Sequence, residues 1–482
     1  MARTWDTLDR GEYVRLQETL LRDFVTRFLY PFSPFYRQHL DAHGIKPYQI
    51  RRVRDLQQIP PVSAQDFARS EEDPWRPFRA LLRPDEDRLK RWAHRVLLGR
   101  VARERLYRGD DAAERVVAEE FKPVHLLSSP DSGPVVGYTL RDLSAMSQAG
   151  ARALAVAGGT RTSVLVSTLP YGPQLPFWNI YYGALGAGMT AFHLGAGEAI
   201  RPSEVARWMA RVGATMFVAQ PAYAEGLLRG APPAAFGRLR TLALWGIGGM
   251  AGARERFTTM LRTGGAPEAG VTTLLGIPEA RAAWAECPTP PGQPEASYGY
   301  HTYPDLELLE VVDDAGHVVA DGEPGELLYT SLDWRGSVML RYRTGLFLRR
   351  GITRAACPGC GRTVPRIDPD ISRVEWRTTV RTRKGEVPVD LADVMPALWR
   401  ASSVPVWELE VIRDPRGGGS DSIVAYLGGA DQDQAREVQR ALAPYGVRCK
   451  VLPFPQLSRR LALGLERPEA RVRFSAKGSA KS

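Results

Sequence analysis

The sequence predicts an α/β protein. We expect a large N-terminal domain with mostly parallel sheets flanked by helices plus a β-hairpin or barrel part, followed by a small α+β C-terminal lid domain. Short apolar runs alternate with helical stretches between residues 124 and 275, which is typical of parallel sheets. Hairpin patterns replace this alternation after about residue 296, and a shorter strand and helix pattern starts near residue 373. A chain of 482 residues also exceeds what one hydrophobic core supports.

The composition is that of an ordinary globular protein, with 44% hydrophobic and 24% charged residues. The formal net charge is +10, but only seven of the 64 basic residues are lysines, and the arginines are scattered among Ala, Gly and Pro. A nucleic-acid-binding protein concentrates its charge on one face or stripe. We therefore expect a solvated, arginine-rich surface and no nucleic-acid partner.

The cysteine content and the apolar runs bear on the compartment. Four cysteines in 482 residues are too few for a disulfide framework, so we expect a reducing, cytoplasmic location. The first six residues lack the apolar run of a signal peptide. Residues 162–197 carry no Asp, Glu, Lys or Arg, but three prolines and several glycines interrupt them. This stretch predicts a buried strand, helix and strand, and we expect no membrane segment.

The first 90 residues are expected to be mainly helical. In residues 12–29 the apolar side chains recur at three- and four-residue spacing, which indicates an amphipathic helix. Residues 70–120 are strongly charged, and their pattern predicts no particular structure.

A regular series follows between residues 163 and 275. The expected strands are 163–169, 190–194, 215–219, 241–245 and 271–275, and the expected helices are 174–187, 203–212, 222–229 and 252–262. Such alternation implies right-handed crossovers and a largely parallel sheet that helices cover on both faces. Ligands of such sheets bind at the carboxyl ends of the strands.

The remaining chain predicts hairpins and then a smaller unit. Residues 306–312 and 325–330 are expected to be antiparallel strands. The lid is expected to contain strands 406–412, 422–427 and 447–452, helix 431–443 and a flexible glycine loop at 417–420. We divide the chain into a large domain, residues 1–372, a lid, residues 373–470, and a disordered tail, residues 471–482.

Cys357 and Cys360 form a CxxC knuckle, whose two thiolates can ligate one tetrahedral metal ion. A single CxxC is also found as a redox pair or by accident. Two further candidate ligands precede it, Cys287 in Ala-Glu-Cys-Pro and His301 in Tyr-Gly-Tyr-His. The alternative is that Cys287 fills an apolar space and His301 lies on the surface.

Several of these segments resemble the phenylacetate–CoA ligase branch of the adenylate-forming enzymes. Leu340-Arg-Tyr-Arg-Thr-Gly345 and Cys357-Pro-Gly-Cys-Gly-Arg-Thr-Val-Pro-Arg-Ile367 are similar to the end of that branch's large domain. The similarity runs from about residue 30 to residue 472. It implies AMP-forming activation of a small carboxylic acid to an acyl-AMP and then to a CoA thioester, with ATP, Mg and CoA as cofactors. It also implies structural Zn²⁺ at the two cysteines, Cys287 and His301, because several relatives bind an ion at matching positions.

The resemblance extends to the nucleotide and acid sites. Leu127-Ser-Ser-Pro-Asp-Ser-Gly-Pro134 is similar to a phosphate loop of the form S-S-G-T-T-G-x-P, where small residues let backbone amides surround an anion. The nucleotide contacts that it implies are Ser128, Ser129, Ser132, Gly133, Gly246, Gly248, Thr344 and Arg366. Glu279 would hold Mg²⁺, and Arg373 lies at the hinge arginine. Tyr171, Gly172 and Phe177 would line a pocket for an aryl or apolar acid, although core packing explains them equally well.

Three departures weaken the catalytic motifs. Pro130 and Asp131 replace Gly and Thr in the phosphate loop, which removes an amide donor and adds a negative charge. Leu346 stands where relatives carry the aspartate that binds the ribose hydroxyls. The segment that matches the adenylation-lysine motif, residues 458–472, contains no lysine, although Arg467 offers a charge. These departures predict weak ATP binding and slow or absent adenylation.

Three functions therefore stay open. The first is an active AMP-forming ligase, and the second is a catalytically degenerate homologue that acts as a binding or scaffolding protein. The third is a partial reaction, acyl transfer from a ready-made adenylate or thioester. A homodimer also stays open, and nothing in the sequence identifies the acid.

Overall fold

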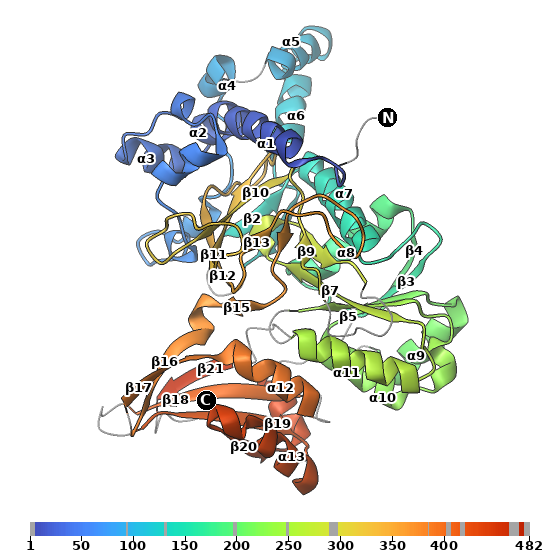
Figure 1. Cartoon of the computed structure of the whole chain (residues 1–482). Coiled ribbons are helices and arrows are strands. Elements are labelled where there is room, and N and C mark those ends of the chain that lie inside the picture. The colour runs from blue at the N-terminus through green and yellow to red at the C-terminus, as the bar shows by residue number, and fades with distance from the viewer. Residues whose placement is uncertain are drawn as a thin grey trace.

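The computed structural model describes residues 5–92, 95–129, 133–195, 200–246, 250–288, 297–383, 385–401, 406–414, 420–461 and 472–476. It has the predicted α/β class: large sheets flanked by helices, with a smaller group of strands and helices at the C-terminal end of the chain (Figure 1). The predicted strands between residues 163 and 275 are confirmed in number and type.

The N-terminal segment is helical, as predicted. Helix α1, Arg10–Phe24, begins with a capping box. The Asp9 carboxylate accepts from the backbone amide of Glu12, and the Glu12 carboxylate accepts from the backbone amide of Asp9. A π-helical turn, Val25–Leu29, and the short helix α2, Tyr30–Phe32, continue it, and α3, Pro34–Ala42, follows. The buried side chains of these helices pack in one apolar cluster with the strands between residues 307 and 348.

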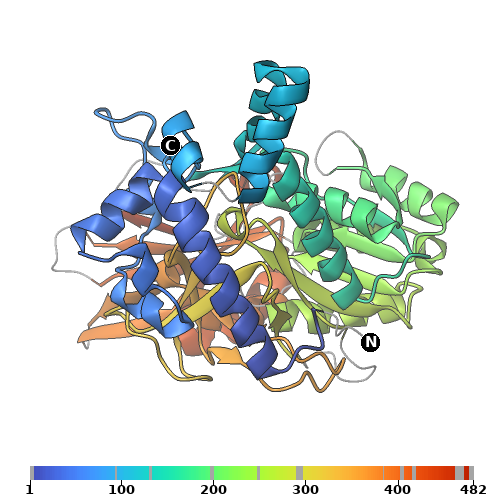
Figure 2. The ribbon, with the colours of Figure 1, turned by 90° about the horizontal axis from the view of Figure 1, so that it is seen from above.

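Residues 70–120, whose pattern predicted no structure, contain three helices. They are α4, Glu86–Trp92, α5, Arg95–Arg108, and α6, Asp110–Phe121. Helices α5 and α6 pair as a hairpin, and Figure 2 shows these light-blue helices rising from the body of the molecule.

The main sheet has nine strands in the order β13-β14-β9-β8-β7-β6-β5-β3-β4. Strands β3 to β7 are parallel: β3 Val164–Ser167, β4 Thr190–His193, β5 Met216–Ala219, β6 Thr241–Trp245 and β7 Gly270–Gly276. The others add antiparallel pairs: β8 Ala283–Glu286, β9 Tyr300–His301, β13 Ile352–Thr353 and β14 Arg366–Ile367.

Helices cover both faces of this sheet. On one face α7, Leu140–Val156, and α8, Leu175–Ala187, pack on one apolar cluster. On the opposite face, a second apolar cluster lies beneath three helices, α9, Pro202–Val212, α10, Pro221–Gly230, and α11, Met250–Thr263. Alternate residues of the strands supply the two clusters, because side chains point to opposite faces along a strand.

A second sheet stands beside the first. Its four antiparallel strands are β10, Glu307–Val312, β11, Gly325–Ser331, β12, Tyr342–Leu348, and β15, Ile371–Arg373. The two predicted antiparallel strands, 306–312 and 325–330, are β10 and β11. A separate hairpin, β1, His125–Ser128, and β2, Val135–Tyr138, flanks residues 130–132.

The C-terminal group contains a hairpin, a four-stranded sheet and three helices. The hairpin is β16, Arg377–Thr382, with β17, Gly385–Asp390, and the sheet order is β20-β19-β18-β21. Its strands are β18 Trp407–Arg413, β19 Ser422–Gly428, β20 Val447–Leu452 and β21 Val472–Ala476. Its helices are α12 Val394–Ala401, α13 Gln432–Leu442 and α14 Phe454–Arg460.

The predicted disorder of residues 471–482 is wrong for the part that the structure describes. Strand β21 pairs in parallel with β18, and Val472 packs against the apolar cluster beneath the sheet. Val472 and Phe474 alternate with polar residues, and the low-complexity residues that follow obscured this short strand pattern. Residues 471 and 477–482 lie outside the described ranges, as do residues 417–419 of the predicted glycine loop.

The C-terminal group packs against α11 through α12. A Cβ on Gly252 would lie 2.6 Å from the carbonyl oxygen of Pro396, so only glycine allows this close approach of the two helices. Arg400 donates to both carboxylate oxygens of Glu255 at 2.8 Å. One apolar cluster runs through both elements.

None of the helices in the described ranges combines the length and the apolar character needed to cross a bilayer.

Candidate active site and metal centre

Glu279 lies at the carboxyl end of β7, in the short 3₁₀ turn Pro278–Ala280. Its side chain is buried, and one oxygen, Oε1, accepts two hydrogen bonds. Ser129 Oγ donates at 2.6 Å, and the Tyr342 hydroxyl donates at 2.9 Å. The other oxygen, Oε2, has no partner among the described residues. Three segments far apart in the sequence therefore meet at one carboxylate, at the edge of the sheet where ligands of parallel sheets bind.

The turn that carries Glu279 is held by Arg281. Arg281 has a positive φ of 59° and is completely buried, with its guanidinium 4.3 Å from the ring centroid of Trp334. It donates to Ser331 Oγ at 2.8 Å and to the carbonyl oxygen of Ser337. These bonds tie the turn to the end of β11 and to the loop before β12, and they limit the positions open to the Glu279 carboxylate.

The phosphate-loop candidates divide into two groups. Ser129 and Gly133 lie against Glu279: a Cβ on Gly133 would be 2.8 Å from the Ser129 Cβ and 3.5 Å from Glu279 Oε1. Ser128 instead donates its hydroxyl to the carbonyl oxygen of Pro173 at 3.4 Å. Ser132, with the substituted Pro130 and Asp131, lies outside the described residues.

The residues around the expected ribose contact are enclosed. Thr344 donates its hydroxyl to the carbonyl oxygen of Leu327 at 2.7 Å, and the amide of Leu346 donates back to that hydroxyl at 3.1 Å. The Leu346 side chain is completely buried in the apolar cluster beneath the N-terminal helices. Strand β12 therefore offers no side-chain acceptor to a ribose at this position.

The remaining nucleotide and catalytic candidates lie in different places. Arg373, on β15, pairs with Glu375 at 2.9 Å, and its guanidinium lies 3.8 Å from the position of a Cβ on Gly345. The amide of Gly246 donates to the carbonyl oxygen of Leu274 at the end of β7. Gly248 and Arg467 lie outside the described residues.

Arg366 is not near Glu279. It pairs with His301 between β14 and β9, and its guanidinium donates to the backbone carbonyls of Tyr298 and Ala355. The structure thus places Arg366 beside the cysteine cluster, and its role as a nucleotide contact stays a prediction.

The acyl-pocket candidates belong to an aromatic cluster at the start of α8. The rings of Tyr171 and Phe177 lie 5.3 Å apart, and Trp178 donates its indole N–H to the carbonyl oxygen of Gly172 at 2.8 Å. His193 also packs against Phe177, with ring centroids 5.7 Å apart. Tyr171 is 70% exposed, so the cluster opens to solvent at one side.

His193 and Tyr342 are site residues that the sequence analysis missed. His193 ends β4, where strand ends meet ligands, and that position is the signal that identifies it. Burial lowers the pKa of His193, so its ring is neutral at pH 7, and Nδ1 has no hydrogen-bond partner among the described residues. Tyr342 lies within the segment that carries the family resemblance, but no local pattern reveals its bond to Glu279.

The four predicted metal ligands come together. The ligand atoms of Cys287, His301, Cys357 and Cys360 all lie within 4.8 Å of one another. The sulfurs of Cys287 and Cys357 are 3.7 Å apart, and Cys360 Sγ lies 3.2 Å from His301 Nε2. His301 is buried, so the alternative of a surface histidine is wrong.

The secondary structure explains the cluster. Cys287 follows β8, His301 lies on the adjacent β9, and Cys357 and Cys360 lie in the turn between β13 and β14. His301 Nδ1 is 3.2 Å from the carbonyl oxygen of Ala285, which leaves Nε2 to face the sulfurs. Three thiols and an imidazole oriented in this way fit a closed tetrahedral Zn²⁺ site.

The chain is similar in sequence to a known family and to several known proteins. Residues 136–342 match the family model described as "AMP-binding enzyme". The chain is 29% identical to the phenylacetate-coenzyme A ligase of Thermus thermophilus over 78% of its length and 74% of the relative's. It is 26% identical to the phenylacetate-coenzyme A ligase of Escherichia coli, over 75% and 71% of the two lengths.

Solved structures show the same fold. A structure of 2-hydroxyisobutyryl-CoA ligase in the postadenylation state, in complex with 2-HIB-AMP, aligns with a TM-score of 0.70 at 19% identity. The alignment covers 97% of this chain and 90% of that one. An open conformation of the same ligase gives a TM-score of 0.60 at 18% identity, over 93% and 90% of the two chains. The motifs, the family match and these relatives together support a place for the chain in the phenylacetate–CoA ligase-like branch of the adenylate-forming enzymes.

Proposed function

We propose that this protein is an AMP-forming ligase that activates a carboxylic acid. A carboxylate oxygen of the acid attacks the α-phosphorus of ATP and pyrophosphate leaves, which gives an acyl-AMP. The thiol of CoA then loses its proton and attacks the acyl carbon of the acyl-AMP, the bond from this carbon to the phosphate oxygen breaks, and AMP leaves, which gives the thioester. The observation that carries the proposal is the meeting of Ser129 and Tyr342 at Glu279, at the ligand-binding edge of the sheet.

Glu279 would hold the Mg²⁺ that accompanies the phosphates of ATP. Two hydroxyls occupy Oε1, and no described residue bonds Oε2, so the carboxylate presents one oxygen in a fixed direction. Burial raises the pKa of the Tyr342 hydroxyl well above its usual range, so this group stays a donor throughout the physiological pH range. Mg²⁺ would supply positive charge beside the phosphates.

We propose that the acid lies at the aromatic cluster formed by Tyr171, Phe177 and His193. Aromatic walls suit an aryl or apolar acid. The neutral His193 offers one polar atom, Nδ1, to a substituent on the acid. The relatives that the chain resembles are named for phenylacetate, which makes phenylacetate the first acid to test.

The cysteine cluster would hold structural Zn²⁺. One ion would join the end of β8, strand β9 and the turn before β14, and thereby brace the antiparallel edge of the main sheet. We also expect a cytoplasmic location, which suits the four free thiols. A homodimer stays open.

The alternative, a catalytically degenerate binding protein, rests on the altered motifs. The enclosed Leu346 supports it, because a ribose loses its usual acceptor there. The family match and the curated relatives favour the ligase. Loss of the ribose acceptor by itself would weaken nucleotide binding without abolishing the reaction.

The test is pyrophosphate release by purified protein with ATP, Mg²⁺ and a series of aryl and apolar acids that begins with phenylacetate. We expect release that requires both ATP and an acid, and a CoA thioester after CoA is added. Folded, zinc-loaded protein that releases no pyrophosphate with any acid of the series would support the degenerate alternative.

A further inference from the structure

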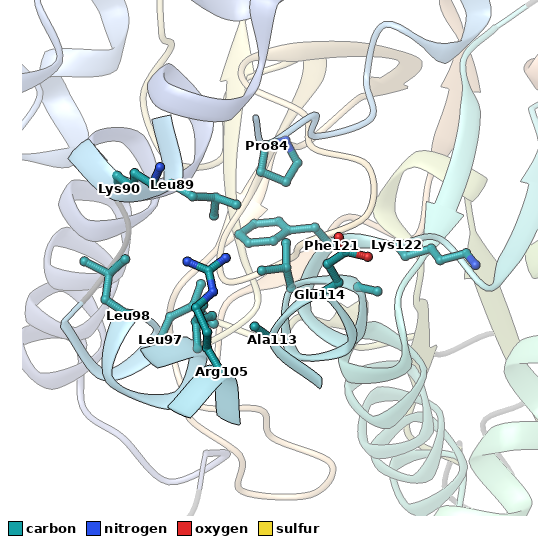
Figure 3. A pocket seen from close by; sticks show the side chains of 13 residues that line it. Pro84, Leu89, Lys90, Leu97, Leu98, Arg105, Ala113, Glu114, Phe121 and Lys122 are labelled. Carbon is teal, nitrogen blue, oxygen red and sulfur yellow. The ribbon is translucent and has the colours of Figure 1, made fainter. Parts of the chain in front are cut away.

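A cavity of about 430 Å³ lies among α4, α5 and α6 (Figure 3). Its walls are mainly aliphatic and aromatic, and the apolar residues that form them are Leu89, Leu97, Leu98, Val101, Val117 and Phe121. The Phe121 ring is buried and packs on Phe32 at 5.2 Å between centroids, so this wall is part of the core. A concave apolar space of this size with a few polar groups is typical of a small-molecule site.

One charged group lies at the edge of the apolar part. Figure 3 shows the guanidinium of Arg105 between Leu97 and Phe121, whereas the side chain of Lys122 extends away from the centre. Arg105 Nε bonds Asp110 at 2.8 Å, and the terminal nitrogens of Arg105 have no partner among the described residues. The Arg105 side chain is half exposed, so it stands at the mouth of the cavity.

The other charged residues that line the cavity are Lys90, Lys122 and Glu114. With Asp110, which pairs with Arg105, three basic and two acidic residues leave an excess of one positive charge. Two of the seven lysines in this arginine-rich chain therefore lie around one cavity. This charge favours an anion at the mouth over a cation.

We infer that this cavity binds an amphipathic carboxylate, whose aliphatic or aryl body fills the apolar part and whose carboxylate pairs with Arg105. The two terminal nitrogens of a guanidinium match the two oxygens of a carboxylate, and a pair of parallel hydrogen bonds fixes the head group. The body replaces water against the apolar walls.

The site is separate from the proposed acyl pocket, because it shares no residue with the cluster of Tyr171 and Phe177. Helix α6, which forms one wall, ends at Phe121, and β1 begins four residues later and leads to Ser129. The cavity thus lies one short connection from the phosphate loop. The inference goes beyond the proposed function, since binding here needs neither ATP nor turnover.

The experiment is isothermal titration of the full chain with decanoate, below its micelle concentration and without ATP. Decan-1-ol and decylammonium have the same body with no charge and with the opposite charge. Arg105→Gln removes the head-group contact, and Val117→Trp fills the apolar part. Arg108→Gln is the matched control, because Arg108 lies on the same helix, is 72% exposed and pairs with Glu104.

We expect decanoate to bind the wild type. Decan-1-ol should bind the wild type roughly 10- to 100-fold more weakly than decanoate, and decanoate should bind Arg105→Gln more weakly by a similar factor, the effect of losing a charged hydrogen bond. Val117→Trp should abolish this binding, and Arg108→Gln should leave it unchanged. Three results would overturn the inference: no binding by the wild type, equal binding of the alcohol, or binding that survives Arg105→Gln but is lost in Phe177→Ala. The last result would place the acid in the acyl pocket, and pyrophosphate release tests that pocket's function separately.

Discussion

At the scale of single residues, the active-site candidate is a carboxylate whose direction is fixed by its neighbours. Ser129 and Tyr342 bond the same oxygen of Glu279, and Arg281 holds the turn beneath it. Strand β12 supplies Tyr342 and, four residues later, the enclosed Leu346. One strand therefore supplies a hydrogen-bond donor to Glu279 and carries no side-chain acceptor at position 346.

Tyr342→Phe tests the orientation of Glu279. Loss of a hydrogen bond to a charged group costs about 1.5–3 kcal/mol, so we expect kcat/KM for Mg·ATP to fall roughly 10- to 100-fold, with a higher Mg²⁺ requirement. Tyr329→Phe is the matched control. Tyr329 is the cross-strand neighbour of Tyr342, is equally buried, and donates to the carbonyl oxygen of Ala280 rather than to the carboxylate. If both variants have the same Mg²⁺ requirement as the wild type, Tyr342 does not position Glu279.

The raised pKa of buried Glu307 predicts that the stability of the protein depends on pH. Burial raises the pKa of Glu307 to about 8, although the Trp284 indole and the Tyr303 amide both donate to its carboxyl. The folded state therefore holds a proton that the unfolded state loses above pH 4.5. The contribution of Glu307 to the free energy of unfolding is fully present below pH 4.5 and is lost as pH rises through about 8. It amounts to about 1.4 kcal/mol per unit of difference between the folded and unfolded pKa.

Urea unfolding between pH 5 and about 9 measures this effect. Glu307→Gln keeps an oxygen that accepts both bonds and cannot ionise, so its free energy of unfolding should decline less over the same interval. Parallel curves for the wild type and Glu307→Gln would show that Glu307 is ionised in the folded protein.

At the scale of elements, the sequence predicts what local patterns encode. The strands between residues 163 and 275 and the helices between them follow from periodicity and turn residues. The order of the sheet, with β3 between β4 and β5, depends on contacts between distant segments. Strands β9 and β14 have two residues each, so only their pairing across the chain defines them.

The same distinction applies to the candidate site. The four candidate metal ligands could be predicted because the CxxC spacing marks two of them and the family motifs mark all four. The bonds to Glu279 from Ser129 and Tyr342 join positions 150 and 63 residues away, and no local pattern reports them. Helices α4 to α6 were not predicted because charged residues cover much of their surface and few apolar positions reveal a face.

The close contact between Gly252 on α11 and Pro396 on α12 predicts that a larger residue at position 252 separates the two helices. In Gly252→Val the new side chain collides with the backbone of Pro396 and pushes α12 away from α11. Limited proteolysis should then cut near residue 373, or within residues 415–419, much earlier than in the wild type, and well before residues 160–345. Gly226→Ala, on α10, is the control, because nothing lies within 4 Å of its Cβ. Equal proteolysis of Gly252→Val and the wild type would show that this contact does not hold the C-terminal group.

At the scale of the whole molecule, the cysteine cluster joins segments that are otherwise linked by short strands. Cys287 and Cys360 are separated by 73 positions and lie on opposite sides of His301 in the sequence. A metal ion there would stabilise the folded chain by binding it in preference to the unfolded chain. The antiparallel edge of the main sheet would depend on it most.

We predict near-stoichiometric zinc in protein purified without added metal, measured by elemental analysis. Cys360→Ala should lose the zinc and unfold at a lower temperature. Cys449→Ala should keep it, because Cys449 lies on β20 in the C-terminal sheet. Wild-type protein without zinc, or Cys360→Ala with a full complement, would contradict the assignment.

The most direct test of the central claim is pyrophosphate release at increasing ATP concentration by the wild type, Glu279→Gln and Glu268→Gln. Glu279→Gln keeps an oxygen for Ser129 and Tyr342 and removes the charge, whereas Glu268 is an exposed carboxylate between α11 and β7. We predict acid-dependent release by the wild type and Glu268→Gln. Because Leu346 supplies no ribose acceptor, the KM for ATP should be roughly 10- to 100-fold higher than in a ligase that has this acceptor. Glu279→Gln should release at most about one hundredth as much. Equal release by Glu279→Gln and the wild type, or none by folded wild-type protein with any acid, would contradict the account.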